Sequence, residues 1–123
     1  MRIRTGIVGL QSVFWPHAFA NCLNSISEAE LVACTSMGLD PNLISISLGK
    51  TPEEYAAQYD VRLYCDPTEM IQKEDLDAVC ICAKHTEIAN FVEQVAPLEV
   101  DIYIAKPMAT TLEAADRIVK AVR

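Results

Sequence analysis

The sequence predicts an α/β fold: a doubly wound parallel sheet with helices on both faces, in three αβα layers. The first observation is an apolar run that ends at Gly9 and is followed at once by a helical pattern. The second is that short apolar runs alternate with helical segments along the whole chain, as in strands joined by crossover helices. The third is the segment 77–83, apolar at every position after Asp77, which is typical of a strand covered on both faces.

The first elements follow from hydrophobic periodicity. Residues 4–8 form a predicted buried strand, and residues 15–26 form the first helix, which tolerates Pro16 in its first turn. The inward-facing stripe of this helix is predicted to contain Ala18, Cys22 and Leu23. Residues 30–35 are the second strand.

Three later helix starts share one pattern, a capping residue followed directly by proline. The caps are Asp40, Thr51 and Asp66, and Glu54 completes a capping box with Thr51. The helices that follow are predicted over residues 41–48, 52–59 and 67–72.

The remaining strands are predicted over 61–64, 77–83 and 100–104. Further helices cover 86–96 and a last segment that runs to residue 122 from a cap at Thr110 and Thr111. Right-handed crossovers between parallel strands then give strand order 3-2-1-4-5, the Rossmann-like arrangement. At 123 residues the chain is expected to be one domain, 1–123.

Charge and hydropathy argue against two classes of partner. The formal net charge is −7, and the basic residues form no patch of the kind that nucleic-acid binding needs. No apolar run reaches the ~20 residues of a membrane span, and the first residues lack the layout of a signal peptide. We therefore expect a cytoplasmic protein with neither a nucleic-acid nor a membrane partner.

The cysteines are odd in number and lie mostly inside apolar runs. Cys22, Cys34, Cys65, Cys80 and Cys82 are therefore expected to be small buried hydrophobic residues rather than disulfide partners. A metal site would need further Cys or His at suitable spacing, so we expect no metal.

A ligand of an open parallel sheet binds beyond the carboxyl ends of the strands, where the strand order reverses. Here that point lies between the first and fourth strands. The candidate cofactor-binding residues in the loops at this edge are Gly9, Gln11, Ser12, Ser36, Ala83, His85, Lys106 and Pro107. His17 is more typical of a packed or solvated helix residue, and Lys84 of a solvated lysine.

Two segments carry a resemblance to a known family. They are Asp-Ala-Val-Cys-Ile-Cys-Ala (77–83), followed by His85, and Ala-Lys-Pro-Met-Ala-Thr-Thr-Leu-Glu-Ala-Ala (105–115). The chain resembles, from Ile3 to its last residue, the N-terminal domain of the glucose–fructose oxidoreductase, inositol dehydrogenase and MocA (Gfo/Idh/MocA) family of NAD(P)-dependent oxidoreductases.

This resemblance implies a domain that binds NAD or NADP, with the choice between them left open, and Lys106 as the catalytic acid/base or substrate-orienting residue. The family carries a second, C-terminal domain that binds a small-molecule substrate of the sugar or polyol class and supports oligomers. That domain is absent from this chain, so we expect the chain alone to be inactive and the full-length form to be a homo-oligomer.

The chain departs from the family pattern at the cofactor side. Gln11 and Phe14 stand where the pattern G-x-G-x-x-G has its second and third glycines, and the Gln11 side chain is expected to crowd a pyrophosphate unless the loop takes another path. Ser36 takes the place of the acidic ribose-binding residue. Two readings follow: an oxidoreductase transferring hydride to or from a hydroxyl-bearing carbon, or a non-catalytic nucleotide-binding or sensor module.

Overall fold

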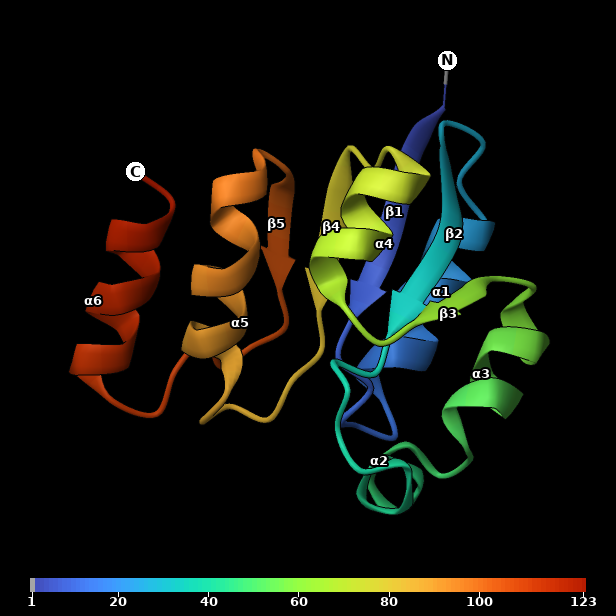
Figure 1. The fold of residues 1–123 in the computed structure, drawn as a ribbon, viewed down its shortest axis with the longest axis horizontal. Coiled ribbons are helices and arrows are strands. Elements are labelled where there is room, and N and C mark those ends of the chain that lie inside the picture. Colours follow the sequence, from blue (N-terminus) through green and yellow to red (C-terminus); the bar gives the residue numbers. More distant parts are fainter. Residues whose placement is uncertain (1) are drawn as a thin grey trace.

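The computed structural model describes residues 2–123 and confirms the predicted fold. A single five-stranded parallel sheet has the order β3-β2-β1-β4-β5 (Figure 1). β1 lies at its centre and pairs with both β2 and β4, so the direction of winding reverses at β1. The strands are β1 (Ile3–Val8), β2 (Ala29–Thr35), β3 (Arg62–Tyr64), β4 (Ala78–Ile81) and β5 (Asp101–Ile104).

Helices cover the two faces of this sheet, and α6 lies beside α5 at the β5 edge (Figure 1). The helices are α1 (Trp15–Asn24), α2 (Pro41–Leu48), α3 (Pro52–Tyr59), α4 (Pro67–Glu74), α5 (Ile88–Val95) and α6 (Leu112–Ala121), with a 3₁₀ turn η1 (Ala96–Leu98).

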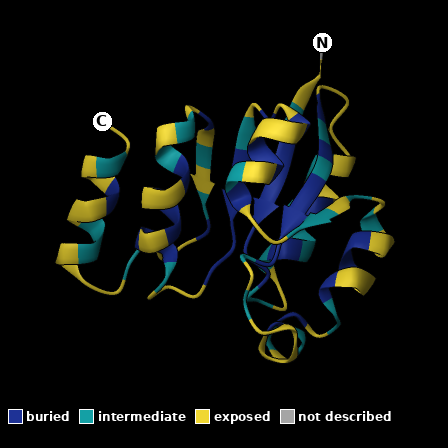
Figure 2. Cartoon of the chain, viewed as in Figure 1, coloured by how far each residue is buried: buried dark blue, intermediate teal, exposed yellow. Residues whose placement is uncertain are grey.

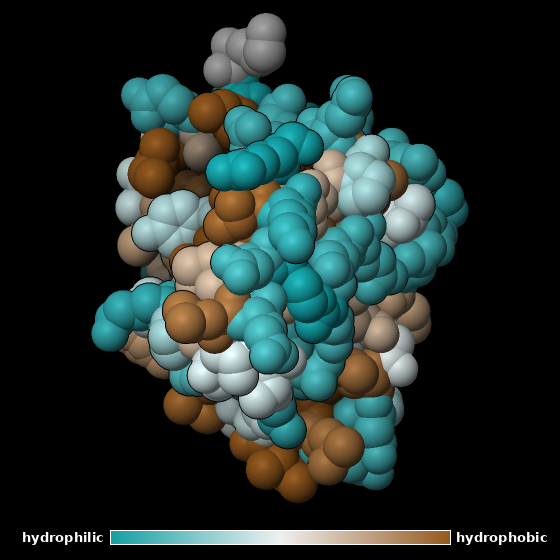
Figure 3. All heavy atoms as spheres, turned by 90° about the vertical axis from the view of Figure 1, so that its left-hand side faces the viewer, coloured by the Kyte–Doolittle hydropathy of each residue, from teal (hydrophilic) through white to brown (hydrophobic). Residues whose placement is uncertain are grey.

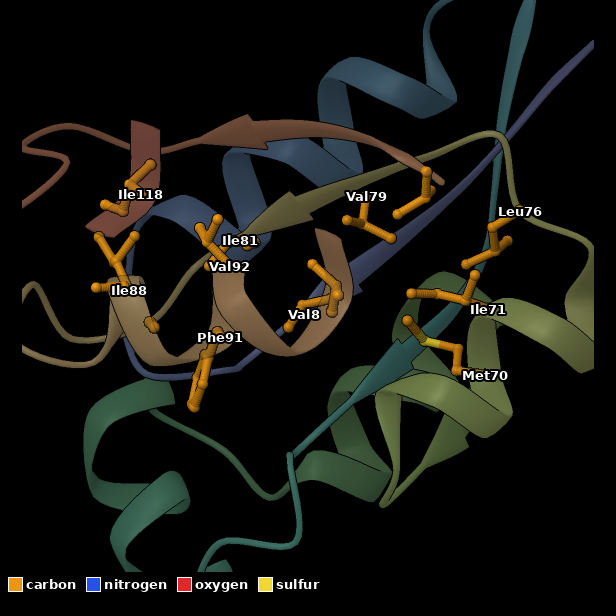
Figure 4. Close-up of a cluster of buried hydrophobic side chains, with 14 of the residues drawn as sticks. Val8, Met70, Ile71, Leu76, Val79, Ile81, Ile88, Phe91, Val92 and Ile118 are labelled. Carbon is orange, nitrogen blue, oxygen red and sulfur yellow. The ribbon is translucent and has the colours of Figure 1, made fainter. Parts of the chain in front are cut away.

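Alternating side chains of the strands fill two separate cores. Val8 packs with residues of α4 and α5 on one face (Figure 4), whereas its neighbour Ile7 packs with residues of α1, α2 and α3 on the other. The central strands are therefore dark along most of their length in Figure 2, while the helices are buried on one side only. The predicted inward face of α5 is confirmed, since Ile88, Phe91, Val92 and Val95 are all buried.

The predicted caps of α2, α3 and α4 are confirmed. The Asp40 and Asp66 carboxylates accept the N–H of Asn42 and of Thr68. Thr51 and Glu54 form the reciprocal capping box at the start of α3. Each of these helices has proline in its first turn, where no intrahelical donor is lost.

Several boundaries differ from the prediction for local reasons. α1 ends at Asn24 rather than 26, because the Ser25 hydroxyl donates to the Cys22 carbonyl at 2.8 Å and closes the last turn. α5 stops before Pro97, which has no N–H to continue the ladder, so η1 follows. The cap of α6 is Thr111 alone, whose hydroxyl accepts the N–H of Ala114, and α6 ends at Ala121.

Among the remaining shifts, β1, β2, β3 and β5 each begin one residue from the predicted start, and larger differences occur at β4, α4 and α5. β4 is ladder-paired only over Ala78–Ile81, shorter than the predicted 77–83. α4 continues to Glu74, two residues beyond its predicted end. A turn in which the Glu87 N–H donates to the Lys84 carbonyl delays the start of α5 to Ile88.

The cysteines divide into two classes. Cys34, Cys80 and Cys82 are buried as predicted, and burial raises the pKa of Cys34 to about 12 and that of Cys80 to about 11. Cys22 and Cys65 are exposed, which corrects the prediction for these two. The prediction that Cys22 is buried was wrong because the buried positions of α1 are Pro16 and Ala20. The inward face of this helix is therefore rotated from the one expected.

Glu74, at the end of α4, joins several elements through its buried carboxylate. It is only 4 % exposed and accepts both a bidentate pair from Arg62 and a hydrogen bond of 2.5 Å from the Tyr64 hydroxyl. Arg4 of β1 lies 3.4 Å from the same carboxylate and donates to the Glu74 carbonyl at 2.8 Å. We call these four residues the Glu74 cluster; it ties the amino ends of β1 and β3 to α4.

The face of the molecule on the α6 side is hydrophilic across most of its centre, with apolar atoms gathered toward its upper and lower margins (Figure 3). Among residues 2–123, no helix combines the length and the hydropathy that crossing a bilayer requires.

Candidate functional site

The candidate site lies at the carboxyl ends of β1 and β4, where the winding of the sheet reverses. A pocket of about 430 Å³ opens there between the loops that follow β1, β4 and β5. We call it the larger pocket. Its lining residues are Gln11, Ser12, Trp15, Ala83, Lys84, His85, Thr86 and Thr110. This is the predicted position for a ligand of a doubly wound sheet.

Gly9 makes the turn that ends β1. Its φ is +81°, a value that residues with a Cβ rarely adopt, and its N–H donates to the Thr35 carbonyl at 2.9 Å. A Cβ built at this position would lie 3.3 Å from a ring carbon of the buried Phe91. The positive φ therefore favours glycine here, and an added Cβ would be tightly packed against the Phe91 ring.

Ser12 organises the start of α1. Its hydroxyl accepts the N–H groups of Phe14 at 3.0 Å and of Trp15 at 3.3 Å. Within residues 2–123, the N–H groups of Ser12 and Val13 donate to no protein acceptor. Two free backbone donors thus sit just before the amino end of a ten-residue helix, an arrangement that suits an anionic group such as a phosphate.

Gln11 connects the loop after β1 with the loop after β4. Its N–H donates to the Cys82 carbonyl at 3.2 Å, and its side-chain Oε1 accepts the N–H of Lys84 at 2.9 Å. We call the second contact the Gln11–Lys84 bridge. The side chain therefore reaches across the crevice between the two loops.

A smaller pocket of about 70 Å³ lies on the α2 side of this bridge. Gln11 and Lys84 line it as well, together with Leu39, Asp40, Leu43, Ile44 and Ser47. Gln11 and Lys84 are thus the residues that the two pockets share.

The structure brings some of the predicted site residues together and leaves others apart. Gln11, Ser12, Ala83 and His85 share the larger pocket. Ser36 is buried at the end of β2, where its N–H donates to the Tyr64 carbonyl, and it lines neither pocket.

Lys106 and Pro107 follow β5, are exposed and are joined by a cis peptide bond. They are at the same end of the sheet as Gly9 with β4 between, which corresponds to roughly 10 Å of strand spacing. Neither residue lines the larger pocket, although Thr110 of the same loop does.

Four lining residues were not predicted as site residues. Lys84 was expected to be a solvated lysine, and it is exposed but also lines the larger pocket. Trp15, in the first turn of α1, stacks on Phe19 and also borders the larger pocket. Thr110 was expected to share the cap of α6 and instead faces the crevice. Nothing in the sequence marked Thr86 as a site residue except its position next to His85.

His17 is a packing residue, as expected. Its Nδ1 lies 2.6 Å from the Tyr59 hydroxyl, and its ring meets the edge of Tyr55 in α3. Burial, with a further effect from Lys50, lowers the pKa of His17. Its side chain therefore belongs to the contact between α1 and α3, and it lines neither pocket of the crevice.

The residues at the crevice fit a dinucleotide. The turn at Gly9, the free N–H groups of Ser12 and Val13 and the open larger pocket suit a nucleotide whose phosphates lie at the start of α1. On the ribose side the fit is weaker, because Ser36 and Met37 follow β2 and the Asp40 carboxylate already caps α2. No group of three metal-ligating side chains occurs within the described residues 2–123.

Residues 3–123 match the family model described as "Oxidoreductase family, NAD-binding Rossmann fold". Among similar solved structures is myo-inositol dehydrogenase from Lactobacillus casei in complex with NAD(H) and myo-inositol. It has 26 % sequence identity and a TM-score of 0.75, and the match covers 98 % of this chain and 33 % of that one.

Two more distant structures share the fold. The WlbA dehydrogenase from Bordetella pertussis, in complex with NADH and UDP-GlcNAcA, has 24 % identity and a TM-score of 0.76, covering 99 % of this chain and 34 % of that one. A mutant of KijD10, a 3-ketoreductase from Actinomadura kijaniata in complex with TDP-benzene and NADP, has 17 % identity and a TM-score of 0.76, covering 100 % and 34 %. The chain thus spans about a third of the length of these structures.

Proposed function

Because the chain belongs to the Gfo/Idh/MocA family of oxidoreductases, we propose that it is the nucleotide-binding half of an NAD(P)-dependent enzyme. The proposed reaction moves a hydride between the nicotinamide ring and a hydroxyl-bearing carbon of a sugar, polyol or similar small metabolite. The observation that carries this proposal is the larger pocket at the reversal point of the sheet, next to the free N–H groups of Ser12 and Val13.

The chain's own residues have distinct proposed tasks. Gly9, Ser12 and Val13 give the phosphates a close backbone approach and hydrogen-bond donors. Ala83, His85 and the other lining residues form the wall of the pocket. The cofactor, when bound, supplies the hydride chemistry, while the protein supplies position and electrostatics.

Lys106 is the proposed catalytic residue. It follows β5 at the same edge of the sheet as the larger pocket, and its side chain is exposed, so it is free to reach a substrate brought to that edge. We assign it the exchange of the proton on the reacting hydroxyl, or the orientation of that hydroxyl. Pro107 restricts the backbone immediately after it.

The substrate and the assembly belong to the whole protein. We propose a C-terminal substrate domain, a homo-oligomeric state and a cytoplasmic location for the full-length form, and no turnover by residues 1–123 alone. NAD and NADP both stand as candidates, because solved relatives of this fold bind one or the other.

The test is a pair of measurements on the full-length protein. Fluorescence titration with NADH and with NADPH should give saturable binding of at least one, and absorbance at the reduced-nicotinamide band should report turnover on a panel of polyols and sugars. Lys106→Ala should abolish turnover and leave nucleotide binding within about twofold. Lys120→Ala, an exposed lysine in α6, is the matched control and should keep both. Absence of saturable binding by the wild type would refute the proposal.

A second candidate function is a non-catalytic nucleotide sensor, favoured by the Gln11–Lys84 bridge that stands across the crevice. It predicts nucleotide binding without turnover on any member of the panel, and no effect of Lys106→Ala on any measured quantity.

A further inference from the structure

The Gln11–Lys84 bridge divides the crevice into two compartments. The larger pocket lies on the α6 side and the smaller one on the α2 side, and Gln11 and Lys84 belong to the lining of both. A dinucleotide has two nucleotide halves joined by a pyrophosphate, so it needs both compartments and the space between them. A mononucleotide needs only one.

The bridge is a specific contact between two loops that are far apart in sequence. It joins the Gln11 side-chain oxygen to the Lys84 backbone N–H over 2.9 Å, across 73 residues of chain. The Gln11 N–H is also held by the Cys82 carbonyl at 3.2 Å, so the residue is fixed to the β4 loop by its backbone as well as its side chain.

Lys84 adds a charge to the same wall. Among the residues that line the two pockets, it is the one lysine or arginine, and its side chain is exposed. An anionic ligand that enters the passage meets this cation, whereas the amide of Gln11 occupies the space between the loops. Lys84 thus attracts an anionic ligand, and Gln11 obstructs its path between the two pockets.

We propose that Gln11 is a specificity-determining residue that restrains dinucleotide binding: its side chain closes the passage between the two pockets and must leave Lys84 before a dinucleotide can bind across them. This inference rests on the proposed function, since it concerns the same nucleotide site. A reduced nicotinamide mononucleotide, which fits the larger pocket alone, does not require the bridge to open.

The experiment compares two ligands on the full-length wild type and on Gln11→Ala. Gln11→Ala has no side-chain hydrogen bond to Lys84 that must break when a dinucleotide binds. NADH or NADPH should therefore bind about threefold to tenfold more tightly to this variant. The affinity for reduced nicotinamide mononucleotide should change by less than the dinucleotide affinity, because Gln11 lines the larger pocket but no bridge has to open for this ligand. Gln72→Ala, the same chemical change on the exposed side of α4, is the control and should alter neither affinity.

Hydrogen exchange of the Lys84 amide gives a second measurement that does not depend on ligand affinity. The amide should be protected in the free wild type, and it should exchange faster in Gln11→Ala and in the dinucleotide complex of the wild type. Equal exchange rates of the Lys84 amide in the wild type and in Gln11→Ala would show that the bridge does not form in solution, and this would overturn the proposal.

The affinities separate the remaining outcomes. Unchanged or weaker dinucleotide binding by Gln11→Ala would overturn the proposed role of Gln11 and leave the oxidoreductase proposal intact. If neither nucleotide binds to either protein, both proposals fail. A thermal melt of each variant within a few degrees of the wild type shows that the compared proteins are folded.

Discussion

Tyr55 and Pro16 join two helices by a buried hydrogen bond. The Tyr55 hydroxyl in α3 donates to the Pro16 carbonyl in the first turn of α1 at 2.5 Å, and the Tyr55 side chain is fully buried. Burial also raises the pKa of Tyr55, so the hydroxyl keeps its proton as a donor. Because Pro16 lies in the first turn of α1, α3 helps to fix the direction in which the amino end of α1 points.

Tyr55→Phe should lower the free energy of unfolding by about 1–2 kcal/mol, since the Pro16 carbonyl would lose its buried donor. Urea denaturation followed by circular dichroism measures this loss. Tyr59→Phe removes the more exposed hydroxyl that contacts His17 and should cost less. Equal losses in the two variants would contradict the special role of Tyr55.

Glu74→Gln should lower the free energy of unfolding by about 2–3 kcal/mol, because the buried carboxylate holds Arg62, Arg4 and Tyr64 through charge-assisted hydrogen bonds. Chemical denaturation at pH 7 is the measurement. Glu69→Gln breaks an exposed pair with Lys73 in the same helix and should change stability by less than about 0.5 kcal/mol. A Glu74 effect as small as that of Glu69 would show that the cluster contributes little.

Acid should remove the contribution of Glu74 within a defined range of pH. The Arg62 guanidinium is the main cause that lowers the pKa of Glu74 from its ordinary 4.5 to about 2 in the folded protein. Because the folded pKa is the lower one, the stabilisation is complete above pH 4.5 and disappears as the pH falls toward 2. The expected loss is about 2 kcal/mol, reduced from the full shift because Arg62 is mostly exposed.

Unfolding free energies of the wild type and of Glu74→Gln, measured from pH 7 down to pH 2, test this assignment. The gap between the two proteins should narrow as the pH drops below 4.5. A gap of constant size down to pH 2 would mean that another group titrates there.

Gly9→Ala should destabilise the protein by more than Gly38→Ala. Both glycines have a positive φ, which costs about 1–2 kcal/mol for a residue with a Cβ. At Gly38 the nearest atom to a new Cβ is the Cys65 carbonyl oxygen at 3.9 Å, whereas at Gly9 it is the Phe91 ring at 3.3 Å. Differential scanning calorimetry of the two variants isolates the packing component; equal shifts in melting temperature would exclude it.

Features that depend on neighbouring residues could be predicted from the sequence. The caps at Asp40, Thr51 and Asp66 bond amides two or three residues away, so their patterns are local and were confirmed. The strand order followed from the alternation of elements and the handedness of crossovers. Where two residues matched one pattern, as Thr110 and Thr111 do, only the structure could assign the cap to Thr111.

Features that depend on distant residues could not be predicted. The Gln11–Lys84 bridge spans 73 residues, and nothing in the loop around Gln11 identifies its partner. Glu74 is one of several acidic residues near a helix end, and its burial becomes evident only when β1, β3 and α4 are assembled. The outward position of Cys22 depends on how α1 is rotated against the sheet. The hydrophobic periodicity of the sequence predicted this rotation incorrectly.

The Glu74 cluster lies at the amino ends of β1 and β3, away from the crevice at the carboxyl ends of the strands. The polar cluster that joins the strands to α4 and the proposed ligand site therefore lie at opposite ends of one sheet. Exposed crevice residues such as Lys84 and His85 can be exchanged without weakening the polar cluster at the other end. This separation makes the crevice a suitable region for randomised libraries aimed at new cofactor preferences, in which the residues of the Glu74 cluster are kept unchanged.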